Sequence, residues 1–239
     1  MTTPSRLEGR ARSARPRRRR PLSLAAIVDA AMAILDAEGL DAVSMRRVAG
    51  HFDTGPASLY AYVANRDELL QHVLHRVVDE IVVLEKDSWQ ETLRSWVLEG
   101  RRVMARHADV ARLTFGTVPV TERMVEAVEV LLRQMIQGGV PPRVASWALD
   151  ITSLFLGADV YEGWLMAQKF ADGSGRDVEE IGQDYFQGIA AGFASLPRER
   201  FPYLLDNLGL MMSGGSDDRF VFGLDLLIAG IAAQVSSTS

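Results

Sequence analysis

The chain has 239 residues, of which 48% are hydrophobic, 24% are charged and none is cysteine. This balance is typical of a globular protein, and the lack of cysteine excludes disulfides, thiol nucleophiles, cysteine zinc sites and iron–sulfur clusters. The net charge of -5 conceals a split, since residues 1–22 hold eight arginines and one glutamate, a charge of +7, which leaves -12 for the remainder. No apolar stretch reaches the length of about 18 residues that a membrane helix needs. The basic N-terminus is also not followed by the apolar stretch of a secretion signal. We therefore expect no membrane partner and no secretion signal, and we expect a cytoplasmic protein.

The N-terminal 22 residues are predicted to form a disordered basic arm. The run Arg17, Arg18, Arg19 and Arg20 lies between two prolines and repels itself too strongly to pack. Guanidinium groups bind phosphate through a planar fork and enter narrow minor grooves, so nucleic acid is the natural partner of this arm. A solubilising or cloning-derived tail also fits the arm, and the residues that follow decide between the two.

The chain from residue 23 onward is predicted to be all-α. Apolar residues recur at helical spacing almost throughout, and no segment alternates apolar and polar residues as a strand does. A first helix is expected to start after Ser23 as its N-cap and to stop at Gly39. A second helix starts after Ser44, and a third, only about two turns long, covers 56–62 after a tight turn at 53–56.

A fourth helix is expected to begin at Asn65. Asn65 and Glu68 have the spacing of a capping box, and apolar residues continue at helical spacing as far as Leu84. The three short helices that precede it, with a tight turn between the last two, have the sequence shape of a helix-turn-helix. In that motif the final helix lies in the major groove of DNA.

The segment 56–62 is the candidate recognition helix. Its outward positions carry Ser58, Tyr60 and Tyr62, while Leu59 and its neighbour Val63 point inward. A tyrosine hydroxyl can donate to a phosphate or a base edge, and its ring can contact a thymine methyl. A small helical cap with half-buried tyrosines is the alternative. The flanking arginines suited to phosphate are Arg46, Arg47 and Arg66.

The run TGPASLYAYVANRDELL at 54–70 resembles the recognition region of the tetracycline-repressor (TetR) family. The hallmark of that region is a Leu-Tyr pair, an aromatic residue or His, and a small cap before a Lys or Arg. A weaker likeness continues through 88–90, 116–119 and 156–158. The resemblance implies a homodimer that binds a palindromic operator in double-stranded DNA through the residues named above, most often as a repressor. Asp53 departs from the family, which usually has Gly there, but Asp tolerates a left-handed backbone.

We therefore expect a disordered basic arm over 1–22, a helix-turn-helix DNA-binding domain over 23–70, and a larger helical ligand-binding and dimerisation domain over 71–239. A Gly- and Ser-rich loop is expected at 171–177, and a short helix around Leu204. The helices expected in the C-terminal domain cover 89–106, 110–115, 122–137, 143–170, 178–196 and 216–235.

Two of these helices, 143–170 and the final one, are apolar on more than one face. A helix that is apolar on two faces is buried on two. A four-helix interface between two subunits explains this best, and the family resemblance implies the same dimer, while a plain intrachain core is the alternative. On 143–170 one stripe is Val144, Ala148, Ile151, Phe155, Ala158 and Leu165, and the other is Ala145, Leu149, Leu156 and Val160.

The C-terminal part is rich in large, adaptable or flat side chains, which are the materials of an apolar small-molecule pocket. Thr114 stands where tetracycline-responsive members of the family carry a His that holds a drug-bound metal, and Trp96 stands where they offer an amide. The resemblance therefore implies a largely apolar small-molecule effector. Glu162 can meet a cationic group, although a salt-bridged or solvated role fits it too. The candidate effector residues are Trp96, Met104, Thr114, Phe115, Thr117, Met135, Trp147, Phe155 and Glu162.

Metal binding and catalysis have weak support in the sequence. His72, His75 and Asp79 lie three and four residues apart, but no fourth ligand is evident and a solvated helix face explains them as well. His51 and His107 are isolated. Because no Gly-rich phosphate loop, no Gly-x-Ser-x-Gly elbow and no paired-carboxylate motif is present, we expect no enzyme, no cofactor and no metal. The runner-up function is a helical small-molecule-binding module whose basic tail binds anions nonspecifically.

Overall fold

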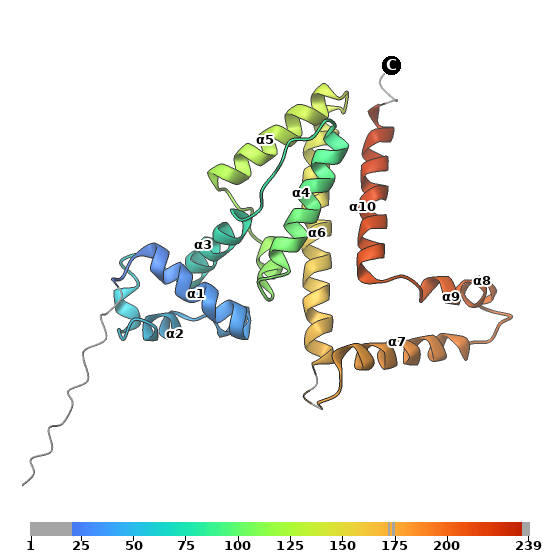
Figure 1. The fold of residues 1–239 in the computed structure, drawn as a ribbon, viewed down its shortest axis with the longest axis horizontal. Helices are drawn as coiled ribbons and strands as arrows, with labels where there is room; N and C mark the ends of the chain where they lie inside the picture. Colours follow the sequence, from blue (N-terminus) through green and yellow to red (C-terminus); the bar gives the residue numbers. More distant parts are fainter. Residues whose placement is uncertain (1–20, 172, 174, 236–239) are drawn as a thin grey trace, which may run out of the picture.

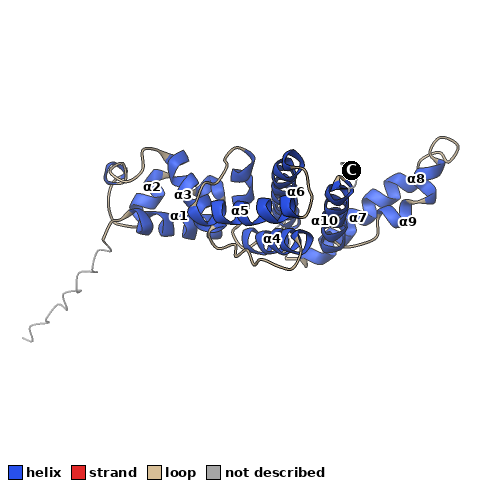
Figure 2. Ribbon diagram, turned by 90° about the horizontal axis from the view of Figure 1, so that it is seen from above, coloured by secondary structure: helices blue, strands red, loops and turns tan. Residues whose placement is uncertain are grey.

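The computed structural model describes residues 21–171, 173 and 175–235, so most of the predicted basic arm lies outside the described residues. Every regular element in the described part is a helix, which confirms the predicted all-α class (Figure 2). The N-terminal elements are α1 (Leu24–Glu38), η1 (Leu40–Ala42), α2 (Met45–Gly50), η2 (Pro56–Ser58) and α3 (Arg66–Val78), where η denotes a 3-10 helix. The C-terminal elements are α4 (Trp89–Met104), η3 (Val110–Phe115), α5 (Glu122–Gln137), α6 (Pro142–Phe170), α7 (Val178–Ala194), α8 (Pro202–Asp206), α9 (Leu208–Met211) and α10 (Ser216–Ala233).

Side-chain caps determine where the first helices begin. Ser23, Ser44 and Asn65 each accept a hydrogen bond from the backbone N–H three residues further on. A cap of this kind contributes about 1 kcal/mol, and the starts predicted from these residues are confirmed. The predicted capping box is only half formed, because the Glu68 carboxylate accepts from the N–H of Ala64 instead of that of Asn65.

Helix α3 ends earlier than its apolar stripe predicts. It stops at Val78, and residues 81–86 form an irregular strap that leads to α4 (Figure 1). Ile81 in this strap is buried, whereas Leu84 is exposed. The β-branched run at 81–83 is stiff at χ1 and has low helix propensity, which accounts for the early end.

The other helices lie close to their expected ranges. Residues 110–115 form a 3-10 helix, the geometry that short helical pieces often take. The short helix expected around Leu204 is α8, and a further short helix, α9, follows it. No helix in the described part is both long and apolar enough to cross a lipid bilayer.

One continuous core joins the head (α1 to α3) to the body (α4 to α10). Buried apolar residues run from Ile27 in α1 to Ile231 in α10 as a single cluster. Helix α6 packs against α4, α5, α10 and η3, so it is the central element of the body. Helix α7 leaves the end of α6 at a steep angle and leads to α8 and α9, which lie away from the rest of the body (Figure 1).

Helix α6 buries its second predicted stripe within the subunit and divides the first, in which Ala148 is buried while Ile151 and Leu165 are exposed. Ala145, Leu156 and Val160 of the second stripe are buried, as is Leu149. The opposite side of α6 is open, and beside it the outer side of α10 is open as well, which leaves an uncovered apolar face. The large exposed apolar residues that define this α6/α10 face are Trp147, Ile151, Leu154 and Leu165 on α6 and Phe222 and Leu226 on α10.

Candidate functional site

The turn after α2 presents the candidate recognition segment. Asp53 has a φ of 53°, so it takes the left-handed backbone expected of it. Gly55 caps η2, and Pro56 occupies the first helical position, where a missing N–H costs no hydrogen bond. The hydroxyl oxygens of Thr54 and Ser58 lie 2.8 Å apart and tie the turn to the segment, and Ser58 is exposed.

The recognition segment is tighter than the α-helix expected over 56–62. Only η2 is helical, and residues 59–62 continue as turns. Backbone hydrogen bonds run three residues back, from the N–H of Leu59 to Pro56 and from that of Tyr62 to Leu59, at 2.9 Å each. So short a segment that starts with proline forms few four-residue bonds, which favours 3-10 geometry and corrects the expectation.

The tyrosines of this segment face solvent. Tyr60 is 54% exposed and Tyr62 is 40% exposed, while Leu59 and Val63 are buried beneath them. The outward and inward positions are therefore those predicted, and the tyrosines are not tucked into the head. The hydroxyl of Tyr62 also donates a 3.1 Å hydrogen bond to the carbonyl oxygen of Leu22, the last residue of the predicted basic arm.

Two flanking arginines lie on the surface of α2. Arg46 is exposed and has no hydrogen-bond or ion-pair partner among the described residues. Arg47 pairs with Glu38 at the end of α1, and the hydrogen bond from Arg47 lowers the pKa of Glu38. An exposed pair stabilises little and is screened by salt, so Arg47 can exchange this partner for a phosphate. The candidate arginines at 17–20 lie outside the described residues.

Arg66 points into the head, in contrast to the outward position expected. Its Nε donates to the carbonyl oxygen of Val43 at 2.7 Å, and its Nη2 donates to that of Leu40 at 2.9 Å. Both carbonyls belong to the connection between α1 and α2. The structure thus brings Arg66 together with that connection.

A polar junction between head and body has no counterpart in the sequence analysis. The Asp109 carboxylate, 1% exposed, accepts a 2.6 Å hydrogen bond from the backbone N–H of Leu40. His107, which was expected to be isolated, lies with Nδ1 3.0 Å from a carboxylate oxygen of Asp36. The partners are 69 and 71 residues apart along the chain, so no local spacing signals either contact.

Three candidate effector residues belong to the buried core of the body: Trp96, Met104 and Met135. The indole N–H of Trp96 is buried and has no hydrogen-bond partner in the described part of the chain. An unpaired buried donor costs on the order of 1–3 kcal/mol. A ligand whose hydrogen-bond acceptor reached this N–H would remove that cost and would therefore bind more tightly.

A second group of candidates surrounds η3. The Thr114 Oγ1 lies so close to α6 that a Cβ on Gly157 would be 2.7 Å from it, so a side chain at Gly157 would displace η3. Phe115 is exposed and contacts Tyr161 edge to face, with ring centroids 6.1 Å apart. Thr117 lines a small hollow of about 130 Å³ between α3 and the η3 region.

The remaining three candidates are all on α6, where Phe155 packs against the edge of the buried core. Phe155 stacks on Phe220 of α10 with ring centroids 4.9 Å apart. Trp147 and Glu162 are exposed on α6. The structure therefore does not gather the nine candidate effector residues in one pocket.

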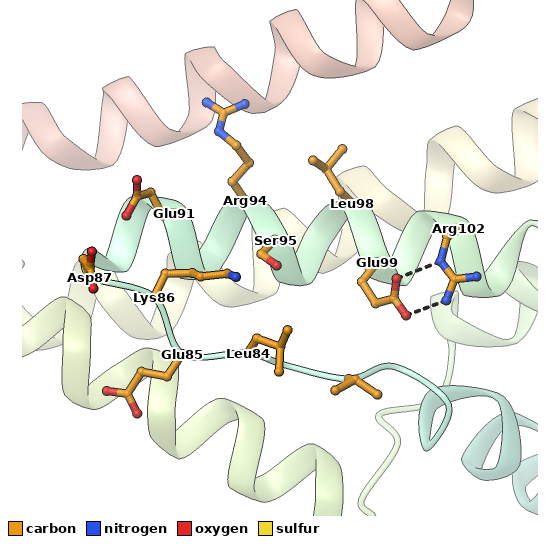
Figure 3. Close-up of a pocket in the computed structure, with 11 residues that line it drawn as sticks. Leu84, Glu85, Lys86, Asp87, Glu91, Arg94, Ser95, Leu98, Glu99 and Arg102 are labelled. Carbon is orange, nitrogen blue, oxygen red and sulfur yellow. Dashed lines mark hydrogen bonds and ion pairs between the residues drawn. The ribbon is translucent and has the colours of Figure 1, made fainter.

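A larger groove lies on the outer side of α4 (Figure 3). It has a volume of about 870 Å³ and is bounded by α4 and the strap that precedes it. Leu84 and Leu98 line it, and the ion pair between Glu99 and Arg102 closes one end. None of the nine candidate effector residues lines this groove.

The three residues considered for a metal site make other contacts in the structure. His72 and His75 on α3 have ring centroids 6.3 Å apart. The Asp79 carboxylate accepts a hydrogen bond from the hydroxyl of Thr121. Within the described ranges, no three His, Cys, Asp or Glu side chains are grouped to hold a metal ion.

Comparison with known proteins covers both head and body. Residues 27–73 match the family described as bacterial regulatory proteins, tetR family, and residues 83–235 match the tetracyclin repressor-like C-terminal domain. The chain belongs to the TetR family. The resemblance at 54–70 is thereby confirmed, and this TetR-family chain is a DNA-binding transcriptional regulator with a ligand-binding C-terminal domain.

Individual TetR-family relatives align over nearly the whole chain. The tetracycline repressor protein class D of Escherichia coli is 27% identical over 221 residues, which cover 90% of this chain and 92% of that protein. The HTH-type transcriptional repressor DrrR1 of Streptomyces coeruleorubidus is 30% identical over 223 residues, or 90% of this chain and 79% of DrrR1. The crystal structure of the Streptomyces coelicolor TetR family protein ActR in complex with actinorhodin has a TM-score of 0.80 at 35% identity, over 92% of this chain and 99% of ActR. These relatives are transcriptional regulators and not enzymes.

Proposed function

We propose that this TetR-family regulator is a homodimeric repressor that binds a palindromic operator through its heads and releases it when a small molecule enters the body. The recognition segment carries the proposal, because Tyr60 and Tyr62 are exposed above buried anchors. In a major groove their hydroxyls and rings would reach base edges, while the arginines meet phosphates. Operator DNA places this activity in the cytoplasm. The proposed DNA contacts are Arg46, Arg47, Ser58, Tyr60 and Tyr62, together with the arm arginines 17–20.

The uncovered α6/α10 face supports the dimer. The same face of a second copy would cover it and form a four-helix interface, which a two-fold axis makes self-complementary. The two heads then need to lie about one DNA turn apart, roughly 34–36 Å, to enter successive major grooves. An effector that binds more tightly when the two heads lie at a different distance lowers the affinity for operator. Operator then lowers the affinity for effector by the same factor.

For the effector we propose a flat, largely apolar molecule that carries a hydrogen-bond acceptor. The body core offers the flat Trp96 and the adaptable Met104 and Met135, and the indole N–H lacks a partner among the described residues. ActR, 35% identical to this chain, has been crystallised with actinorhodin, which supports a small-molecule effector in this family fold. Thr114 offers a hydroxyl in place of a metal-binding side chain, so the proposed effector is bound without a metal.

Replacing Trp96 with phenylalanine tests the effector site. The change removes the indole N–H and keeps an aromatic ring, so effector affinity should fall about tenfold while operator binding without effector is unchanged. Compounds found by thermal shift are titrated against both proteins, and release of operator is followed for each. Trp164→Phe, the matched change on α6 outside both the candidate effector residues and the α6/α10 face, should leave effector affinity unaltered. Loss of effector binding in Trp164→Phe instead would place the site elsewhere.

Deleting residues 1–20 tests the basic arm together with the DNA-binding function. A palindromic operator is first selected with the full chain from a library of random duplexes, and binding is then measured in rising salt against excess nonspecific DNA. The deletion should weaken binding and reduce the salt slope by about 0.9 for each phosphate that the arm neutralises. An unaltered salt slope would show that the arm neutralises no phosphates of the operator. Uniform, salt-labile binding with no selected palindrome would instead favour the small-molecule module with an anion-binding tail.

A further inference from the structure

The guanidinium of Arg66 bridges two backbone carbonyls of the head. It donates to Val43 at 2.7 Å and to Leu40 at 2.9 Å from adjacent nitrogens of one planar group, and the side chain is half-buried. Leu40 and Val43 are both buried residues, and their two hydrogen bonds with Arg66 are partly buried. A fork with fixed donor directions matches two fixed carbonyls, whereas the point charge of a lysine does not.

The same connection is held from the body. The N–H of Leu40 donates to the Asp109 carboxylate at 2.6 Å, so residue 40 is bound on its N–H by the body and on its C=O by Arg66. On its other side, Arg66 is the first residue of α3 and directly follows the N-cap Asn65, three residues after the recognition segment. Hydrogen bonds therefore link the body, the α1–α2 connection and Arg66, and the backbone of residues 63–65 continues from Arg66 to the recognition segment.

We propose that Arg66 is a positioning residue for operator recognition, which holds the recognition segment against the α1–α2 connection and does not contact phosphate. The inference rests on the proposed DNA-binding function. If Arg66 turned outward to a phosphate, the Val43 carbonyl would lose its bond from Arg66 and the Leu40 carbonyl would keep only its bond from the N–H of Val43, so one charge-assisted contact would replace two. The exposed Arg46, which has no partner among the described residues, carries no such cost and is the better phosphate ligand.

The experiment compares Arg66→Lys and Arg66→Gln with the full-length wild type. Affinity for the selected operator, affinity for nonspecific duplex and the salt slope are measured below the unfolding temperature of each variant, with the active fraction determined by stoichiometric titration. Both variants should bind operator about tenfold more weakly, because each removes the two-carbonyl bridge. Nonspecific affinity and the salt slope should stay at the wild-type values.

Arg46→Gln is the matched control. It should weaken operator and nonspecific binding alike and reduce the salt slope by about 0.9, as expected when one phosphate is no longer neutralised. If Arg66→Gln behaves in that way and Arg66→Lys retains operator affinity, Arg66 is a phosphate contact and the inference is wrong. If both Arg66 variants keep operator affinity and lose only thermal stability, the inference is also wrong. Failure of the proposed function would look different, because the wild type itself would then show no preference for any palindrome.

Discussion

Tyr60→Ala is expected to lower operator affinity by roughly tenfold to a hundredfold, the usual effect of removing one base-reading side chain. The tyrosine is 54% exposed on the recognition segment, so its removal leaves the head core intact and should not alter thermal stability or dimerisation. Affinity for operator and for nonspecific duplex is measured by fluorescence anisotropy. Tyr60→Phe then separates the hydroxyl from the ring, because it removes only the group that can donate to a base edge or a phosphate.

Tyr203 provides the control for this prediction. It is 85% exposed on α8, which lies far from the head in Figure 1, so Tyr203→Ala removes an exposed tyrosine ring without touching the recognition segment. Its operator affinity should equal that of the wild type. Operator affinity that is unchanged in Tyr60→Ala would remove the recognition segment from the proposed DNA-binding surface.

Phe222→Glu is expected to give a monomer and to lower operator affinity about a hundredfold or more. Phe222 is 64% exposed on α10, in the uncovered α6/α10 face, and burying a carboxylate against the same face of a second copy is unfavourable. A monomer binds each half-site independently and loses the effective concentration that links two heads. Light scattering coupled to size-exclusion chromatography gives the mass, and the same operator assay gives the affinity.

Val118→Glu places the same charge on an exposed apolar residue that is not part of the α6/α10 face. Val118 lies in the loop after η3, and this variant should remain a dimer. A Phe222→Glu protein that remains a dimer with wild-type operator affinity would show that the two copies meet elsewhere.

Much of the head follows from local sequence. The caps Ser23, Ser44 and Asn65 and the turn at Asp53 are set by hydrogen bonds and backbone preferences within four residues, and all lie where the sequence predicts. The same is true of the exposed tyrosines, since the spacing of buried Leu59 and Val63 decides which side of the segment faces solvent. The capping box is not fully predicted by local sequence, because the N–H groups of Ala64 and Asn65 both lie within reach along the chain and the Glu68 carboxylate accepts from Ala64.

The packing of the body depends less on local sequence. Both stripes of α6 are apolar, so the pattern predicts burial on two sides without saying which side packs within the subunit. Only the packing of α4, α5, η3 and α10 around α6 assigns Leu156 to the core and leaves Ile151 open. The nine candidate effector residues scatter for the same reason, since composition identifies suitable side chains but not their common location.

The chain alone is enough to infer the helices, their caps and the outward tyrosines, because each depends on neighbours within one or two helical turns. The family can also be inferred from the chain, through the run at 54–70. Three-dimensional packing was needed to turn Arg66 inward and to bring Asp109 and His107 against the head. Those contacts join residues from 23 to 71 positions apart, so they exist only after packing has brought their elements together.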